Sequence, residues 1–153
     1  MGRLVIPAKS WVLVCDGSKS LLFQNEGDGL QLDLQLRQSR AEAGEPTRNM
    51  ATDRPGRAFA SRGKGRSAVE SADLHELAEQ KFLKDLADEL ERTIQAENVS
   101  DLVIVAPARA MGVLRTCLGP RTRTALKTEI GKDLCKLPVT EIEAHLKALR
   151  EIS

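Results

Sequence analysis

Hydrophobic residues form one short uninterrupted run near the N-terminus, and this run predicts a buried strand. Trp11–Cys15 reads WVLVC and is followed by Asp16-Gly17, a pair that favours a tight turn. Ser18–Gln24 is therefore expected to be the second strand of a hairpin. Leucines alternate with polar residues over Leu30–Leu36, which predicts a third strand with one buried face. These three strands are expected to form an antiparallel meander.

An apolar stripe with a spacing of three and four residues begins after residue 73 and predicts a long amphipathic helix. Asp73 and Glu76 have the spacing of a capping pair at its start, and the helix is expected to end near Asn98. The stripe consists of Leu74, Leu77, Ala78, Phe82, Leu86, Leu90 and Ile94.

Strands and helices alternate in the remainder of the chain. Leu102–Ala106 is a second uninterrupted apolar run, expected to be fully buried beside the first strand and parallel to it. Arg109–Leu118 predicts a short helix, and Leu126–Ile130 predicts a strand at the sheet edge. A last helix is expected over Thr140–Leu149, with Glu143 in the capping-box position.

The expected order is β-β-β-α-β-α-β-α, which predicts an α/β fold with a mixed five-stranded sheet and helices packed on it. This is the order of a ribonuclease-H-like core. The length of 153 residues is that of one domain, so residues 1–153 are expected to form a single α/β domain.

Composition excludes several classes of protein. Apolar residues make up 41% of the chain and charged residues 29%, with a net charge of +1, as in ordinary globular domains. No apolar run reaches the roughly 18 residues of a membrane span, so a cytoplasmic protein is expected. The three cysteines lack metal-binding spacing and are expected to be reduced thiols. Neither a metal nor a cofactor is predicted.

Apolar periodicity vanishes from Gln38 to Glu70, and arginine and glycine become frequent. A structureless segment of this length within a domain is usually functional or disordered, so a long basic loop is expected at 38–70. Arginine binds phosphate and carboxylate groups bidentately, and glycine lets the backbone approach them. The alternative is a solvated, mobile linker. The candidate binding residues of this loop are Arg54, Arg57, Arg62, Lys64, Gly65, Arg66 and Ser67.

Two further arginines follow the second buried strand. Arg109 and Arg115 come after the strand end, where open α/β sheets often bind ligands, so both are candidates for the same basic site. The alternative is that they solvate a surface helix. Asp16, at the end of the first buried strand, is the candidate carboxylate of a metal-dependent hydrolase, and its alternative role is in the hairpin turn. Asp101 precedes its strand, so it is expected at the opposite end of the sheet from Asp16.

An ordered series of segments resembles the bacterial host-attachment protein family over about residues 11–149. The segments are WVLVCDGSKSLLF, DRPGRAFASRGKGRSAVES, the helix with Phe82 and Leu90, DLVIVAPARAMGVLR and EIGKDLCKLP. The family is named for a requirement in the attachment of bacteria to host cells. The resemblance implies a phenotype and no particular reaction.

A second, more distant resemblance concerns the residues before the long helix. Gly63–Ala68 is similar to the Gly-Gly-Gln loop in the middle domain of archaeal and eukaryotic peptide-chain release factors, and to the corresponding region of Pelota. Gly65 corresponds to the second glycine, and Arg66 replaces the glutamine that positions the hydrolytic water. The resemblance therefore implies binding to the ribosome, tRNA or other RNA more readily than peptidyl-tRNA hydrolysis.

Two functions remain open from the sequence. The first is a non-enzymatic binding module of the host-attachment family that contacts an anionic partner, ribosome or RNA, through the Arg/Gly loop. The second is a hydrolase that acts on a phosphodiester or ester bond with Asp16 and the loop arginines. The absence of a cluster of acidic residues and of the glutamine favours the first. The sequence does not predict the oligomeric state.

Overall fold

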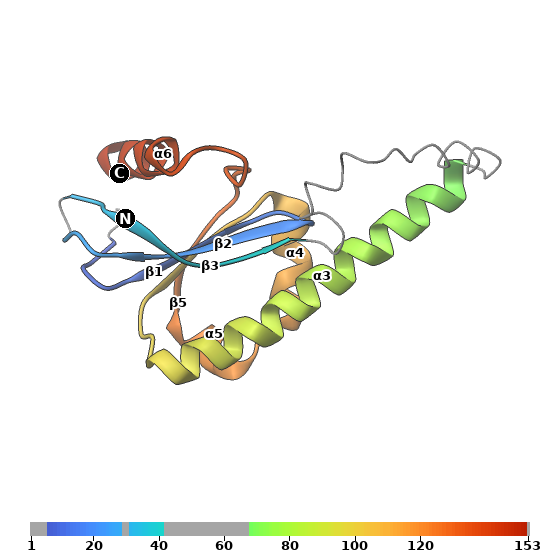
Figure 1. The fold of residues 1–153 in the computed structure, drawn as a ribbon, viewed down its shortest axis with the longest axis horizontal. Helices are drawn as coiled ribbons and strands as arrows, with labels where there is room; N and C mark the ends of the chain where they lie inside the picture. Colours follow the sequence, from blue (N-terminus) through green and yellow to red (C-terminus); the bar gives the residue numbers. More distant parts are fainter. Residues whose placement is uncertain (1–5, 29–30, 42–67, 153) are drawn as a thin grey trace, which may run out of the picture.

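A computed structural model describes residues 6–28, 31–41 and 68–152, with a five-stranded mixed sheet and helices on both of its faces (Figure 1). The strands are β1 (Trp11–Cys15), β2 (Lys19–Asn25), β3 (Leu34–Ala41), β4 (Leu102–Val105) and β5 (Leu126–Ile130). The helices are α3 (Ala68–Glu97), α4 (Ala108–Cys117), α5 (Pro120–Ala125) and α6 (Val139–Ile152).

The sheet has the strand order β3-β2-β1-β4-β5. β1 and β2 form the predicted hairpin, and β3 continues it as the third antiparallel strand. β4 pairs with β1 in parallel, with Trp11 opposite Leu102, and β5 is the parallel strand at the far edge. Every residue of β1 and β4 is buried, so the prediction of two neighbouring, fully buried central strands is confirmed.

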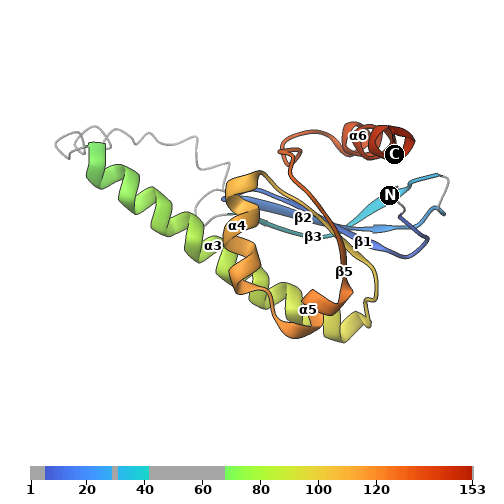
Figure 2. The ribbon, with the colours of Figure 1, turned by 180° about the vertical axis from the view of Figure 1, so that it is seen from behind.

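Each face of the sheet has its own core. Helices α3, α4 and α5 cover one face, and α6 covers the other (Figures 1 and 2). Alternate residues of β1 divide between them, as the period of two in a strand requires: Leu13 packs with the α3 side, and Val12 and Val14 pack with the α6 side.

The third strand differs from its prediction. β3 begins at Leu34 and runs to Ala41, and its leucines do not share one buried face: Leu34 is buried, but Leu36 is 52% exposed. Leu34 and Leu36 point to the same side of the strand, but only Leu34 belongs to the core on the α6 face. After Leu36 the pairing with β2 has an irregularity, where Arg37 has no partner residue and the alternation changes side. Beyond it, Gln38 turns toward α3 and donates a hydrogen bond to the Thr93 hydroxyl at 3.1 Å.

The expected boundaries of the basic loop were too wide. Residues 38–41 belong to β3, where Arg40 forms an ion pair with Glu89 of α3, and residues 68–70 belong to α3. The predicted capping pair at Asp73 is wrong, because the helix begins at Ala68 and Asp73 lies within it. The predicted mobility of residues 42–67 falls outside the described residues.

The helix α5 is not among the elements predicted from the sequence, where Gly119-Pro120 is typical of the end of the preceding helix. Pro120 instead opens a new helix, at a position where its missing N–H and fixed φ are favourable. Glu91 of α3 caps this helix, accepting hydrogen bonds from the amides of Arg121 and Thr122 at 3.1 and 3.0 Å. Because the capping residue lies about thirty positions away in the sequence, no local sequence pattern predicts the start of this helix.

The capping box predicted for the last helix is also wrong. α6 begins at Val139, directly after Pro138, so Thr140 is already inside the helix. Glu143 does not fold back on its own helix. Its carboxylate accepts a hydrogen bond from the Leu34 amide at 2.8 Å and thereby ties α6 to the edge strand β3.

Candidate functional site

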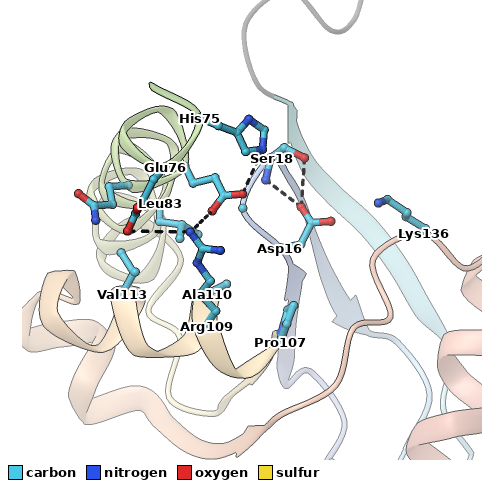
Figure 3. Close-up of a pocket in the computed structure, with 13 residues that line it drawn as sticks. Asp16, Ser18, His75, Glu76, Leu83, Pro107, Arg109, Ala110, Val113 and Lys136 are labelled. Carbon is cyan, nitrogen blue, oxygen red and sulfur yellow. Dashed lines mark hydrogen bonds and ion pairs between the residues drawn. The ribbon is translucent and has the colours of Figure 1, made fainter. Parts of the chain in front are cut away.

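A cleft of about 390 Å³ lies where the carboxyl ends of β1 and β4 meet the neighbouring helices (Figure 3). The chain leaves β1 toward β2 and leaves β4 in the opposite direction, toward β5. Such a divergence at the carboxyl ends of parallel strands is where open α/β sheets place ligands. The polar and charged residues of the cleft are Asp16, Ser18, His75, Glu76, Glu79, Gln80, Arg109 and Lys136.

Asp16 stabilises the turn between β1 and β2. Its Oδ1 atom accepts hydrogen bonds from the amides of Ser18 and Lys19 at 2.8 and 2.9 Å. This is the bonding of an aspartate that closes a turn on its own backbone. The turn role expected from Asp16-Gly17 is confirmed, and Asp101 lies at the opposite end of the sheet, beside Trp11.

Gly17 lets the turn approach α3 closely. A Cβ atom at this position would lie 2.9 Å from the carboxyl carbon of Glu79, closer than a side chain can approach without displacing it. The missing side chain therefore leaves room for the Glu79 carboxylate against the β1–β2 turn. Glu79 is 25% exposed and also lies 3.5 Å from the His75 ring nitrogen.

Arg109 joins the two helices across the cleft. It stands in the first turn of α4, and its guanidinium lies 3.4 Å from the Glu79 carboxylate and 4.0 Å from that of Glu76 (Figure 3). Both distances are long for an ion pair, and the Arg109 side chain is 66% exposed. Exposed pairs of this kind contribute little to stability, so the guanidinium is available to a ligand.

The cleft has charges of both signs around an apolar floor. Leu83, Ala110 and Val113 supply that floor. α4 begins after Pro107 with no side-chain cap and no acidic residue in its first turn. Among the residues that the structure describes, no three His, Cys, Asp or Glu side chains gather in a way that would hold a metal ion.

Of the residues predicted to bind an anion, the described part of the chain contains two. Arg109 lines the cleft. Arg115 lies further along α4 and donates two hydrogen bonds to Glu129 of β5, at 3.0 and 2.6 Å, so the structure does not bring these arginines together. The other candidates, Arg54, Arg57, Arg62, Lys64, Gly65, Arg66 and Ser67, lie outside the described residues.

The two described elements that precede and follow residues 42–67 in the sequence are β3 and α3. β3 ends at Ala41, which pairs with Lys19, one residue from the cleft-lining turn. α3 passes the cleft at His75 and Glu76. Both elements that flank segment 42–67 therefore reach the cleft end of the sheet.

The residues on the α3 side of the cleft are not among those predicted from the sequence. His75, Glu76 and Glu79 continue the helix face that buries Leu83 and Leu90, one to two turns earlier. Extending the core face backwards would have found them. The stripe drawn instead through Leu74 and Leu77 is wrong at its start, because these side chains are 57% and 61% exposed.

The two cysteines near the β1–β2 turn are poor nucleophiles. Burial, with the nearby charge of Asp16, raises the pKa of Cys135 to about 12, and burial raises the pKa of the Cys15 thiol still further. All three cysteines are free, and Cys117 is the one that is partly exposed. A thiol with a raised pKa is rarely ionised at neutral pH, so neither Cys15 nor Cys135 supplies a thiolate to the cleft.

Among the described helices, none combines the length and apolar character needed to cross a membrane. Comparison with curated proteins gives no match. Residues 11–146, which include the whole sheet and the whole cleft, match the family described as "Protein required for attachment to host cells". The chain therefore belongs to this host-attachment family.

Proposed function

We propose that the chain is a non-enzymatic binding module of the host-attachment family, whose segment 54–67 contacts an anionic partner, the ribosome, tRNA or other RNA. The observation that carries the proposal is the distribution of charge. Segment 54–67 contains Arg54, Arg57, Arg62, Lys64 and Arg66 and no acidic residue, a charge of +5. Because the whole chain carries +1, the rest of it carries −4. The positive charge is thus concentrated in one segment, as in surfaces that bind polyanions.

The arginines in the described part of the chain support this difference in charge between segment 54–67 and the remaining residues. Four of them form ion pairs with glutamates of the same chain: Arg37 with Glu26, Arg40 with Glu89, Arg109 with Glu79, and Arg115 with Glu129. Such pairs neutralise the folded surface. They support the proposal that the rest of the chain carries no excess of positive charge and that segment 54–67 supplies the contact with an anion.

The hydrolase alternative has no comparable support. Asp16 Oδ1 is engaged by turn amides, and the described carboxylates form no metal-binding group. Gly63–Ser67, which resembles the release-factor loop, has Arg66 in place of the water-positioning glutamine. Arg66, whose guanidinium can bind phosphate, thus occupies the position at which the release factors have the glutamine that supports hydrolysis.

The test measures the binding of fluorescein-labelled single-stranded RNA and of purified ribosomes at several salt concentrations. The test variant carries Arg57→Ala, Arg62→Ala and Arg66→Ala together. The matched control carries Arg92→Ala, Lys132→Ala and Lys147→Ala, which removes the same charge from three exposed positions on other surfaces.

For the parent chain we expect binding that weakens steeply with salt, because counterions are released from the phosphates. The test variant should lose binding at moderate salt, and where its residual binding is measurable at low salt the slope of log K against log salt should be smaller by roughly two to three. The control should bind nearly as the parent does. Melting should change little in either, since exposed substitutions usually alter stability by at most about 0.5 kcal/mol each. Equal binding by all three proteins would overturn the proposal.

A further inference from the structure

A second pocket, of about 530 Å³, lies between the end of α3 and the short helix α5, which are neighbours in Figure 1. Its lining comes from two stretches of the chain, residues 94–100 and 120–127, and we call it the α3–α5 pocket. It contains Ser100, which precedes β4, whereas the cleft contains Pro107, which follows β4. The two sites therefore lie at opposite ends of the sheet.

Both charged residues that line the α3–α5 pocket are cationic. They are Arg121 of α5 and Lys127 of β5, and no aspartate or glutamate lines the pocket. Outside segment 54–67 the chain carries a net charge of −4, so two cations in a pocket without acidic residues depart from the average of the folded surface. Such a local excess of positive charge favours an anionic ligand.

Neither cation is neutralised by an ion pair. In the part of the chain that the structure describes, the guanidinium of Arg121 and the ammonium of Lys127 have no partner. Glu91 interacts electrostatically with Arg121, but its two carboxylate oxygens accept hydrogen bonds from the amides of Arg121 and Thr122 at 3.1 and 3.0 Å. The donors of both cationic side chains are therefore free for a ligand.

An irregularity in β5 brings Lys127 to the pocket. Lys127 lies between Leu126 and Thr128, which pair with consecutive residues of β4, so it has no partner residue there. In a regular strand Lys127 would point away from the face on which Leu126 packs against the α3 side of the core. The irregularity breaks this alternation, and Lys127 lines the pocket together with Ile94 of that core. Strand irregularities commonly redirect a side chain beside a functional site.

Uncharged polar side chains add further donors and acceptors. Gln95, Asn98 and Ser100 line the pocket, and none of these three side chains has a hydrogen-bond partner among the described residues. The carbonyl oxygens at the end of α3 would repel an anion. Two of them are engaged within the chain, because the Val99 amide donates to Ile94 at 3.1 Å and the Asn98 amide donates to Gln95 at 3.4 Å.

The pocket also has an apolar part. Ile94 and Ala125 are buried, and Val99 packs against the same core. Inorganic phosphate would leave these apolar side chains unused. The combination of free cations, free amides and apolar side chains is that of a site for an organic anion, and the volume lies within the range of about 300–1,000 Å³ found for small-molecule sites.

We propose that the α3–α5 pocket binds a nucleotide. The phosphate lies between Arg121 and Lys127, where a guanidinium can bind it bidentately. The base lies on the apolar side chains, where the amides of Gln95 and Asn98 can donate to its edge and accept from it. A free mononucleotide and the end of an RNA chain present the same phosphate and base. The pocket is separate from segment 54–67, so this proposal does not depend on the proposed function.

The test is isothermal titration calorimetry of the full chain with adenosine monophosphate (AMP). Adenosine and inorganic phosphate are the comparison ligands, since each has only one half of the nucleotide. AMP should bind saturably at a single site. Each comparison ligand should bind at least about tenfold more weakly, because hydrogen bonds to a charged group or contacts with the base are lost.

Substitutions in the pocket separate binding from folding. Arg121→Gln and Lys127→Gln should each weaken the binding of AMP about tenfold or more. Asn98 has a φ of 53°, which glycine adopts readily, so Asn98→Gly should weaken binding without lowering the melting temperature. The matched control is Lys132→Gln, which removes an exposed cation after β5 and should bind AMP as the parent does.

The variant with Arg57→Ala, Arg62→Ala and Arg66→Ala distinguishes the two proposals, because it should bind AMP as tightly as the parent even if it no longer binds ribosomes. In this variant, an oligoadenylate with a terminal phosphate should displace AMP more strongly than AMP itself if RNA ends are the source of the ligand, and less strongly if free nucleotides are. The nucleotide site is overturned if AMP does not bind, or if adenosine or inorganic phosphate binds as tightly. It is also overturned if Arg121→Gln and Lys127→Gln leave AMP binding unchanged.

Discussion

Asn25 is a buried polar residue whose side chain organises the end of the sheet opposite the cleft. It is fully buried, and its Nδ2 group donates to the carbonyl oxygens of Ile6 and Pro7 at 3.0 and 3.2 Å. Its Oδ1 atom accepts from the amides of Gly27 and Asp33, both at 3.0 Å. The Asn25 side chain thus provides hydrogen-bond partners for backbone groups of three separate segments. A pattern of hydrophobic residues does not predict such a role.

Replacing Asn25 should therefore be costly. Asn25→Ala leaves buried amides and carbonyls without partners, and we expect the free energy of unfolding to fall by about 3 kcal/mol. Urea denaturation measures the change. The matched control is Gln35→Ala in β3, which removes an exposed amide that donates to the Asp33 carboxylate two residues earlier, and it should cost no more than about 0.5 kcal/mol. A similar small loss for both variants would contradict the role given to Asn25.

At the scale of the elements, the junction between α4 and α5 depends on one carboxylate from α3. Partial burial acts to raise the pKa of Glu91, but the hydrogen bonds from Thr122 and Arg121 together outweigh it, so the pKa is lowered from 4.5. Gly119, just before α5, leaves room for this cap, because a Cβ there would overlap the Glu91 carboxylate and require it to shift.

Removing the cap should destabilise the protein in a pH-dependent way. Glu91→Ala is expected to lower the free energy of unfolding by about 1 kcal/mol at neutral pH, the usual effect of losing a helix cap. Because the pKa of Glu91 is lower in the folded than in the unfolded chain, its stabilisation is present above pH 4.5. The stabilisation should disappear as the pH falls through the lowered pKa, so parent and variant converge in acid. Urea titrations at a series of pH values measure the difference.

A double-mutant cycle tests the assignment of Gly119. Gly119→Ala alone should cost about as much as Glu91→Ala, since it displaces the same carboxylate. In the Glu91→Ala background it should cost little, because the obstructing group is gone. Additive losses would mean that Gly119 serves α5 in some other way.

The elements differed in how well their residues predicted them. Trp11–Cys15 and Leu102–Val105 were found with their pairing because uninterrupted apolar runs occur in strands covered on both faces. The start of α3 was misplaced because Asp73 offers a cap signal that the helix does not use. Leu36 is exposed although it alternates with Leu34, because the core on that face includes Leu34 and not Leu36, and alternation alone does not predict how far a core extends along a strand.

At the scale of the whole molecule, stability should decrease from the centre of the sheet toward the N-terminal end of α3. Hydrogen exchange should be slowest in β1 and β4, which are buried from Trp11 to Cys15 and from Leu102 to Val105. Within α3, amides near Leu74 and Leu77 should exchange faster than those from Phe82 to Ile94, because only the latter turns pack on the sheet. Uniform protection along α3 would show that the exposed leucines are covered in solution.

The candidate site was only partly accessible from the sequence. Arg109 was found because a residue that follows a buried parallel strand lies at the carboxyl edge of the sheet. His75 and Glu79 were not, because their position depends on how far α3 extends past the β1–β2 turn, and the room that Gly17 leaves for Glu79 is a property of the packed structure. The residues of segment 54–67 remain predictions.

The parallel pair at the centre of the sheet also bears on how the chain can change over evolution. Trp11 pairs with Leu102, so folding must close a loop of 91 residues, of which segment 42–67 contributes 26. The entropy of closing a loop grows only with the logarithm of its length, so these 26 residues add about 0.3 kcal/mol to the cost of closure. Insertions and deletions there are nearly neutral for the stability of the sheet. We therefore expect the length of segment 42–67 to depend on the distance to its binding partner more than on the stability of the sheet.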